Sequence, residues 1–309
     1  MNRWATTMNN RGIALVSVLW VMALLTVVAG GMSAGMKNET QLARNLIDAA
    51  RARHAAEGGV HTAIAGLSDP SAENRWRADR SLHELTIGEA VVRVVVFNES
   101  GKVDLNVAEE RLLDGLLRTA GAADWERPGI VDAILDWRDA DGVTRLNGTE
   151  DGDYRAAGKP YGAKDAPFDS VEELQLIQGM TPPLYRAIKP ALTVYSGSVG
   201  VNPGAASRQV LLAIPGINAR TVDNYVAARE QRLAEGRPPP PWPLINREYT
   251  TRSNGTTYGI HAQARTPSGV TAHMTATVNL RTRSDDAPVT ILSWRDEGGE
   301  LFPRPQGVQ

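Results

Sequence analysis

The residues best suited to chemistry form an acidic cluster near the middle of the chain. It reads Asp136-Trp137-Arg138-Asp139-Ala140-Asp141-Gly142, followed after a short gap by Asn147-Gly148-Thr149-Glu150-Asp151-Gly152-Asp153-Tyr154. Clustered carboxylates repel one another unless cations or basic groups offset their charge, and Ca²⁺ takes about six to eight oxygen ligands in irregular loops. The candidate calcium ligands are therefore Asp136, Asp139, Asp141, Glu150, Asp151 and Asp153.

The spacing of this cluster does not match an EF-hand. Counting from Asp139 as position 1 places Asp141 at position 3 and Glu150 at position 12, as in that motif. Position 6 is Thr144, however, where the sharp turn of an EF-hand needs glycine, and position 5 is Val143, which has no side-chain oxygen. The residues leave two interpretations open: an irregular calcium site, or an acidic loop whose carboxylates are simply solvated.

Two similar helix–glycine–helix patterns lie further along the chain, at 174–180 and 211–217. They look like helix-hairpin-helix motifs, which place backbone amides against nucleic-acid phosphates. The arginines near the second pattern are scattered among acidic residues, and the net charge of the chain is −2, so no global basic field attracts nucleic acid. The two patterns are interpreted as packing units, with DNA binding as the alternative.

Other chemical signatures are weak. His54, Glu57 and His61 lie at helical intervals, but the two imidazoles are two turns apart, too far to meet one ion, so we interpret them as a solvated helix face. The chain has no cysteine, which excludes disulfides and thiolate sites. A Gly-rich phosphate loop, a Gly-x-Ser-x-Gly elbow and a His-Glu-x-x-His motif are also missing, so the sequence gives little support to an enzyme.

An apolar run near the N-terminus determines the predicted membrane topology of the chain. The segment 12–36 contains no charged residue, and roughly 20 apolar helical residues span a bilayer core. Arg3 and Arg11 precede it without any acidic residue, which predicts a cytoplasmic N-terminus and an exported remainder. The alternatives are a plain membrane anchor and a signal peptide cleaved at the small residues of 29–35.

A helical pattern continues beyond this run. Apolar residues recur near helical spacing at Leu42, Leu46, Ala49, Ala50, Ala56, Val60, Ile64 and Leu67. The first proline is Pro70. We therefore predict one helix of roughly 50 residues, about 75 Å long, loosened near its middle by Gly30, Gly31 and Gly35.

Strands are predicted on both sides of a helical block. Before the block, β-branched residues predict a strand at 89–97, a hairpin turn at 98–101 and a short strand at 102–106. The preceding residues 71–84 are polar and have no clear pattern.

After the block, strict alternation of apolar and polar residues predicts a hairpin over 258–280 with its turn at 266–269, and 289–294 reads as a last strand. The block itself contains an acidic loop at about 139–169 and ends at the polyproline-type segment 237–243. Strands separated by a large helical insertion should pair with each other in one sheet.

This arrangement resembles a known family. A short basic leader, a glycine before an apolar run, one long N-terminal helix and a β-rich end are similar to type IV pilin-like proteins. Gly12 matches the last leader residue and Ile13 the mature N-terminus, which implies cleavage by prepilin peptidase and the methylation that belongs to this processing. Most members have glutamate at the fifth mature position, where this chain has Ser17. That departure and the large insertion resemble minor pseudopilin K of type II secretion systems.

The resemblance implies a fold class and a division of the chain. It predicts an α+β protein in which a pilin-like long helix packs on an antiparallel sheet, with a large all-α insertion that contains helix-hairpin-helix (SAM-like) repeats. The implied segments are a leader at 1–12, the transmembrane half of the helix at 13–36, the first part of the pilin-like domain at 37–106, the inserted domain at 107–245, the second part at 246–296 and a flexible tail at 297–309.

The resemblance also implies site residues. K-family proteins are expected to bind calcium in the inserted domain, and their pattern Asp-x-x-Asp-x-Asp, then Glu-Asp and Tyr, matches Asp136, Asp139, Asp141, Glu150, Asp151 and Tyr154. In pilin-like assemblies the fifth-position glutamate pairs with the N-terminal amine of the subunit above. Ser17 has no charge to satisfy, which implies a subunit with no other above it.

The implied function is structural and not enzymatic. The chain would be a single-pass inner-membrane protein with its C-terminal domain in the periplasm, capping the tip of the pseudopilus and helping to initiate its assembly for export of folded proteins across the outer membrane. Its partners would be two other minor pseudopilins in a tip heterotrimer, the major pseudopilin and prepilin peptidase, with no nucleic acid. The alternatives are a membrane-anchored helix-hairpin-helix protein for DNA binding or uptake, and a secreted enzyme.

Overall fold

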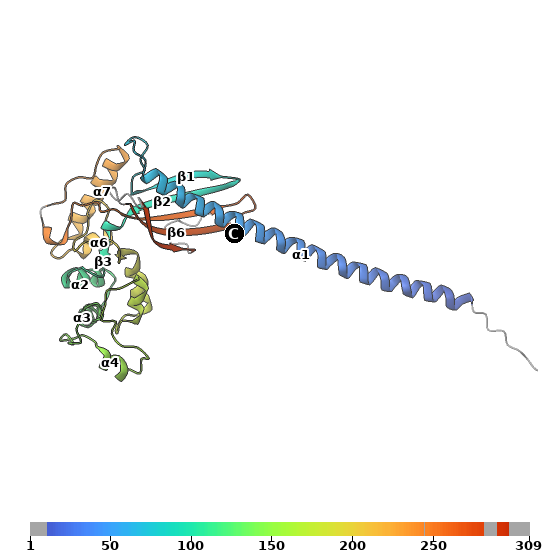
Figure 1. Cartoon of the computed structure of the whole chain (residues 1–309), viewed down its shortest axis with the longest axis horizontal. Coiled ribbons are helices and arrows are strands. Elements are labelled where there is room, and N and C mark those ends of the chain that lie inside the picture. Colours follow the sequence, from blue (N-terminus) through green and yellow to red (C-terminus); the bar gives the residue numbers. More distant parts are fainter. Residues whose placement is uncertain (1–10, 244, 281–288, 297–309) are drawn as a thin grey trace, which may run out of the picture.

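One helix extends far beyond the rest of the molecule (Figure 1). The computed structural model describes residues 11–243, 245–280 and 289–296. Helix α1 (Arg11–Leu67) has 57 residues, which gives about 85 Å at about 1.5 Å per residue. Its backbone is continuous, as the helical spacing predicts. It ends just before Asp69 and Pro70, because a proline disfavours helical geometry in the residue before it.

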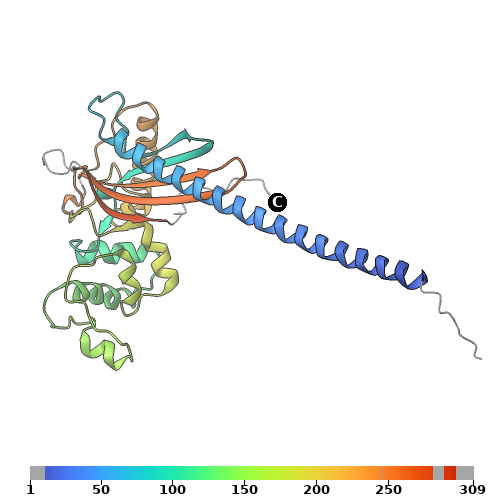
Figure 2. The ribbon, with the colours of Figure 1, turned by 45° about the vertical axis from the view of Figure 1, so that its right-hand side comes forward.

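The C-terminal part of α1 packs across one face of a sheet (Figure 2). Small residues form its buried face: Ala52, Ala55, Ala56, Val60 and Ala63. Gly59 lies on the same face, where a Cβ atom would come 2.7 Å from Val92 Cγ1. The missing side chain therefore lets the helix approach the strands closely.

The N-terminal part of α1 is the segment for which a membrane span is predicted. Its large apolar side chains from Leu15 to Val28 are at least half exposed, with Trp20 at 73%. Side chains at 11–13 and 30–38 lie outside those described. Within the described residues, no helical stretch reaches the length and apolar character that crossing a bilayer requires.

Five strands form one antiparallel sheet in the order β1-β2-β5-β6-β7. They are β1 (Asp79–Ile87), β2 (Ala90–Asn98), β5 (Thr257–Arg265), β6 (Thr271–Leu280) and β7 (Val289–Arg295). The central pairing joins segments from both sides of the helical block, with Val94 of β2 opposite Ala262 of β5. The predicted combination of helices with an antiparallel sheet is confirmed, and so are the hairpin over 258–280 and the last strand.

The first hairpin of the sheet lies earlier in the chain than predicted. Strand β1 begins inside the segment 71–84, whose pattern is unclear because β1 is exposed or half-buried along its whole length. The turn to β2 is at Gly88 and Glu89, and Gly88 has a φ of +59°, which favours glycine. This strand forms because it pairs with β2, since its own residues show little of the apolar–polar alternation that predicts a strand.

The hairpin turn predicted at 98–101 is wrong. These residues enter η1 (Glu99–Gly101), a 3₁₀ turn that begins where the Asn98 side chain accepts a hydrogen bond of 2.9 Å from the Ser100 N–H. The chain then leaves the sheet, and β3 (Val103–Asp104) pairs in parallel with β4 (Leu192–Thr193). The predicted strand at 102–106 is thus shorter and belongs to a separate two-stranded sheet.

Short helices joined by loops make up most of the segment between β3 and β5 (Figure 1). They are α2 (Glu110–Thr119), α3 (Arg127–Arg138), α4 (Asp151–Ala156), η2 (Val171–Leu176), α5 (Pro182–Ile188), η3 (Lys189–Ala191), α6 (Arg208–Ala213), α7 (Ala219–Ala234) and η4 (Arg247–Tyr249). One cluster of buried apolar residues runs from Val103 to Tyr249. We call residues 103–249 the helical block.

A second cluster of buried residues holds α1 to β2, β5 and β6. We call α1 and the five strands the sheet region. The described residues of the two clusters do not overlap, but the two regions touch. Arg295 Nη2 of β7 lies 3.0 Å from Glu172 Oε2 of η2. In η1, which links β2 to the helical block, the Ser100 carbonyl accepts a 2.7 Å hydrogen bond from the Asn202 N–H.

Candidate metal centre

Asp136, near the end of α3, organises the acidic loop. Its side chain is fully buried, and Oδ2 accepts hydrogen bonds from the N–H groups of Thr149 (2.9 Å) and Arg145 (3.3 Å). Gly148 lies against the same oxygen, because a Cβ atom there would come 1.9 Å from Oδ2. Burial raises the pKa of Asp136, although these hydrogen bonds oppose the shift. The loop therefore wraps around a buried carboxylate.

Glu150 shares this neighbourhood with three aspartates. Burial raises its pKa to about 7, and the negative charges of Asp165, Asp136 and Asp139 contribute to the shift. Glu150 is 6% exposed and Asp136 is 0% exposed. The fold thus concentrates negative charge where water cannot screen it well.

Three carboxylate oxygens in this cluster are buried and accept no hydrogen bond: Asp136 Oδ1, Asp139 Oδ1 and Glu150 Oε1. Buried charged oxygens cost free energy unless a partner satisfies them. Carboxylate oxygens are also the donors that Ca²⁺ prefers. By chemical type, these three atoms are therefore suitable ligands for a hard divalent cation.

Arg145 supplies positive charge to the cluster. Its Nε lies 3.2 Å from Asp136 Oδ1, outside hydrogen-bonding geometry, and its Nη2 lies 3.0 Å from Asp139 Oδ2. In this arrangement, no group of three or more His, Asp or Glu side chains in the described part of the chain is positioned to hold a metal ion. Arg145 and a cation would therefore compete for the same two carboxylates.

Aromatic rings pack against the buried side of the loop. Tyr154 is fully buried, with its ring centroid 5.8 Å from that of Trp137 and 5.6 Å from that of Tyr161. Burial raises the pKa of Tyr154 to about 12, and its hydroxyl accepts a hydrogen bond of 3.4 Å from the Gln178 N–H. The phenol therefore stays neutral and fixes α4 against the core of the helical block.

Two of the candidate ligands have local structural roles. Asp141 is exposed, and its Oδ1 accepts a 3.0 Å hydrogen bond from the Val143 N–H. Asp153 lies in the first turn of α4, where its Oδ2 accepts a 3.0 Å hydrogen bond from the Glu150 N–H and completes a capping box. These interactions direct both carboxylates into turns.

Asp151 is also held apart from the buried oxygens. Its Oδ2 lies 2.6 Å from Arg155 Nη2 one helical turn away, and a Cβ atom on Gly162 would come 1.7 Å from its Oδ1. The structure therefore brings Asp136, Asp139 and Glu150 together, while Asp141, Asp151 and Asp153 take other partners.

Sequence reasoning missed Asp165 and Arg145 as members of the cluster. Asp165 has a left-handed backbone conformation with φ +52°, and its charge acts on Glu150. Both residues lie within the acidic loop predicted at about 139–169, and that prediction is the sequence feature that could have identified them. Whether these two residues reach the cluster depends on the path of the loop in space, and the spacing of residues in the sequence does not determine that path.

Comparisons with known proteins find relatives of this chain. A family model for type II secretion system (T2SS) protein K matches residues 91–197. Type II secretion system protein K of Klebsiella pneumoniae is 28% identical over 228 residues, 66% of this chain and 69% of that protein. The protein K of Pseudomonas aeruginosa is 28% identical over 241 residues, 71% of this chain and 72% of that protein.

The chain is therefore similar to type II secretion system protein K. Its fold is also similar to a solved structure, the GspK-GspI-GspJ complex from enterotoxigenic Escherichia coli. That match has a TM-score of 0.54 at 15% identity and covers 85% of this chain and 99% of the other. The similarity extends over both the sheet region and the helical block.

The two helix–glycine–helix patterns of this chain form tight turns. Gly179 (φ +84°) separates η2 from α5, and Gly216 (φ +69°) separates α6 from α7. Near the second turn, Arg208 Nε lies 2.6 Å from Asp223 Oδ1, which neutralises its charge. The similarity to protein K does not favour the DNA-binding alternative.

The residues implied in processing and assembly lie at the start of α1. Gly12 and Ile13 are in its first turn, and their side chains lie outside those described. Ser17 follows about one turn later, on the exposed part of the helix. These residues are far from the acidic loop, at the end of α1 that projects away from the other elements (Figure 1).

Proposed function

We propose that this protein is a minor pseudopilin that caps the tip of the periplasmic pseudopilus. It would help to initiate pseudopilus assembly for the export of folded proteins across the outer membrane, as a structural component and not as an enzyme. The arrangement of the elements supports this proposal. Helix α1 projects from one side of the sheet, and the helical block lies at the other side (Figure 1). Repeating that block along a helical stack would crowd neighbouring copies, whereas one copy fits at the end.

The N-terminal segment would be processed and anchored. Cleavage between Gly12 and Ile13 would remove the leader 1–12, and 13–36 would cross the inner membrane once, with the remaining chain in the periplasm. The absence of charge between Gly12 and Met36 supports this proposal, because charged side chains are costly in the bilayer core. Residues 37–106 and 246–296 would form the pilin-like domain around an inserted domain at 107–245.

Ser17 would determine the position of the subunit. A glutamate held in an apolar environment needs a partner such as the amine of the subunit above. Serine needs none, while the Ile13 amine could still receive the glutamate of the subunit below. The partners would be two other minor pseudopilins and the major pseudopilin, and the composition of the similar GspK-GspI-GspJ complex supports the first part.

Calcium would bind at the acidic loop. Asp136, Asp139 and Glu150 would supply its central ligands, because each has a buried oxygen without a hydrogen bond, and Asp141, Asp151 and Asp153 are the further candidates. The ion would neutralise the cluster and stabilise the loop, since binding to the folded state alone stabilises it by mass action.

The central test is the location of the protein in sheared pseudopili. A label on the helical block should appear at one end of each fibre, with the two partner pseudopilins. Label distributed along the shaft would contradict the tip assignment. Ser17→Glu should leave membrane insertion unchanged and should not turn the protein into a repeating subunit.

Processing is tested by mass spectrometry of the mature protein. An N-terminus at Ile13 is expected after co-expression with prepilin peptidase, and Gly12→Ala, which should block the cut, is the control. An N-terminus within 33–37 would instead indicate signal-peptidase cleavage.

Calcium binding is tested by thermal unfolding with and without chelator. We expect chelator to lower the Tm of the unmodified protein, and Asp136→Asn with Glu150→Gln to abolish that difference. Glu230→Gln is the matched control, because this side chain is exposed on α7 and lies outside the acidic loop. An unchanged melting curve in chelator would refute the calcium proposal.

A further inference from the structure

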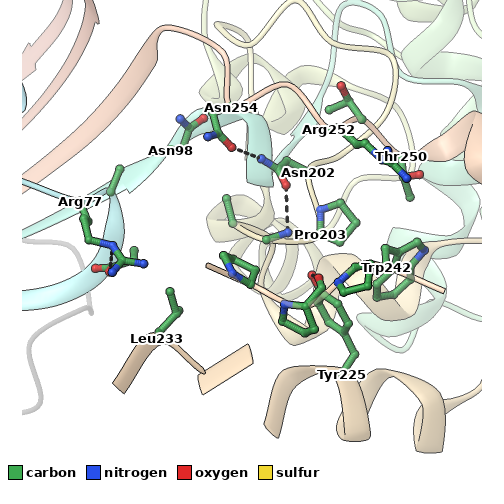
Figure 3. Close-up of a pocket in the computed structure, with 18 of the residues that line it drawn as sticks. Arg77, Asn98, Asn202, Pro203, Tyr225, Leu233, Trp242, Thr250, Arg252 and Asn254 are labelled. Atoms are coloured by element: carbon green, nitrogen blue, oxygen red, sulfur yellow. Dashed lines mark hydrogen bonds and ion pairs between the residues drawn. The ribbon is translucent and has the colours of Figure 1, made fainter. Parts of the chain in front are cut away.

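An open cavity lies between the sheet region and the helical block (Figure 3). Its volume is about 550 Å³, within the range of about 300–1,000 Å³ that is typical of ligand pockets. Its walls come from the segments 75–79, 202–205, 239–243 and 247–254, together with Tyr225 and a few other residues. It shares no described residue with the acidic loop.

The charged side chains in this cavity are mostly positive. Among the described residues, it is lined by four arginines, Arg75, Arg77, Arg247 and Arg252, against one acidic residue, Asp79. Asp79 is already paired with Arg77 at 3.3 Å. The side chains of Arg247 and Arg252 form no hydrogen bond or ion pair with the part of the chain that the structure describes. Two guanidinium groups are therefore available to an anionic ligand.

Two more arginines lie close behind one wall. Arg229 donates hydrogen bonds to the carbonyls of Pro203 (2.8 Å) and Ala206 (2.6 Å), so it supports the wall at Pro203. Burial lowers the pKa of Arg80, and the charge of Arg229 lowers it further. Glu99 attracts Arg80 but is itself held by Lys102 at 2.8 Å. The positive potential is thus not cancelled locally.

The remaining lining suits a polypeptide. Tyr225 and Trp242 meet edge to face with centroids 4.7 Å apart, next to a run of prolines. On another side, Asn202 Nδ2 donates a 2.8 Å hydrogen bond to Asn254 Oδ1. Aromatic-lined grooves contact extended peptides in several recognition domains, and side-chain amides can hydrogen-bond a peptide backbone.

The arrangement of the arginines favours an extended ligand over a small anion. Figure 3 shows Arg77 at the left of the cavity and Arg252 at its upper right, with Trp242 and Tyr225 below Arg252. A single phosphate would fill only a small part of a cavity of about 550 Å³. A peptide with several acidic residues could fill more of it and pair with Arg247 and Arg252, because arginine pairs well with carboxylates.

We propose that this cavity binds an extended acidic peptide segment of a partner protein. Arg247 and Arg252 would pair with its carboxylates, the asparagine side would hydrogen-bond its backbone, and the Tyr225–Trp242 side would contact its aliphatic groups. This inference is independent of the proposed place in the pseudopilus, since neither the tip position nor calcium requires the cavity.

The test uses the full-length protein in detergent and a fluorescent hexaglutamate peptide, with binding followed by anisotropy at low salt. A matched hexaglutamine peptide should bind at least about tenfold more weakly. The double variant Arg247→Ala/Arg252→Ala should weaken hexaglutamate binding by about tenfold or more. Both side chains are exposed, so the variant should keep the melting temperature of the unmodified protein.

Arg220→Ala is the control, because Arg220 is an exposed arginine of α7 outside the cavity. It should change binding by less than about twofold. Equal losses in the two arginine variants would overturn the proposal, and so would equal binding of hexaglutamate and hexaglutamine. Displacement of the peptide by an equal concentration of inorganic phosphate would also overturn it, since that result indicates a site for a single small anion.

Discussion

The sheet region and the helical block fill their cores with different side chains. Alanine and valine supply twelve of the fifteen buried apolar residues that join α1 to the sheet. The described core of the helical block contains ten leucines and six aromatic residues. The helical block also buries the carboxylates of Asp136 and Glu150. One region therefore relies on close backbone approach, and the other on large side chains and balanced charge.

This difference indicates how each region tolerates change. Small side chains allow α1 to lie close to the strands, so the sheet region should be sensitive to added volume. Large side chains hold short helices and long loops together, so the helical block should be sensitive to lost volume and to uncompensated charge. Each prediction below tests one side of this comparison.

The largest effect is expected from removing volume in the helical block. Leu116 is 1% exposed, and Leu116→Ala should lower the free energy of unfolding by about 3 kcal/mol, because the cavity closes incompletely. Val94→Ala in the sheet region should cost less, about 1–2 kcal/mol, since fewer methyl groups are lost. Urea unfolding of the full-length protein in detergent measures both. Leu176→Ala, at 38% exposure, is the control and should stay within about 0.5 kcal/mol.

The next effect comes from adding a methyl group between α1 and the sheet. Gly59→Ala should lower the free energy of unfolding by about 1–3 kcal/mol, because the new Cβ would lie 2.7 Å from the stiff Val92 side chain. Gly58→Ala is the matched control, since its Cβ would meet the movable end of Ile87 at 3.2 Å. It should be neutral or stabilise the helix by up to about 1 kcal/mol. Equal effects at the two positions would show that close packing does not govern this interface.

A smaller effect should appear as a pH dependence in the helical block. The pKa of Glu150 is about 7 in the folded chain, against an ordinary value of 4.5. Between these values the folded state keeps a proton that the unfolded state has lost, so stability falls as pH rises from 4.5 to 7. We expect a loss of about 1–2 kcal/mol over that window in chelator.

Urea unfolding in chelator at both ends of the pH window measures this dependence. Glu150→Gln should remove most of it, and Asp141→Asn should leave it in place. If Glu150→Gln keeps the full dependence, the buried carboxylate is not its source. Added calcium should flatten the dependence if the ion binds ionised Glu150.

The smallest effect is expected at the junction of the two regions. Burial alone would raise the pKa of Glu172, but hydrogen bonds from Arg295 and Lys189 outweigh it and lower the pKa to about 2. The stabilisation is therefore present above pH 4.5 and is lost as pH falls toward 2. Because these side chains are about one-third exposed, Glu172→Gln should cost less than about 1 kcal/mol at neutral pH.

Hydrogen exchange resolved along the chain can locate this effect. Faster exchange should appear in η2 and β7 of Glu172→Gln, while α1 and β2 stay unchanged. Uniformly faster exchange would mean that the two regions unfold as one unit and that the comparison between them does not hold.

The elements with strong periodicity could be predicted from the sequence. The helical spacing and the absence of proline before Pro70 specify α1, and strict alternation specifies the hairpin of β5 and β6. The short and polar elements could not be predicted in the same way. Strand β1 carries little pattern of its own, and the hydrogen bond from the Ser100 N–H to Asn98 replaces the hairpin turn that residue types favour.

The candidate metal centre also has features that the sequence predicts and features that only the structure shows. The sequence alone determined that the chain has a charge-free N-terminal run, strands interrupted by helices and a cluster of carboxylates in one loop. Only the tertiary structure decided that Asp136, Asp139 and Glu150 share a buried neighbourhood with Asp165 and Arg145. The physical reason is that residue type and local spacing determine periodic elements, whereas burial and charge balance depend on where a loop returns in space.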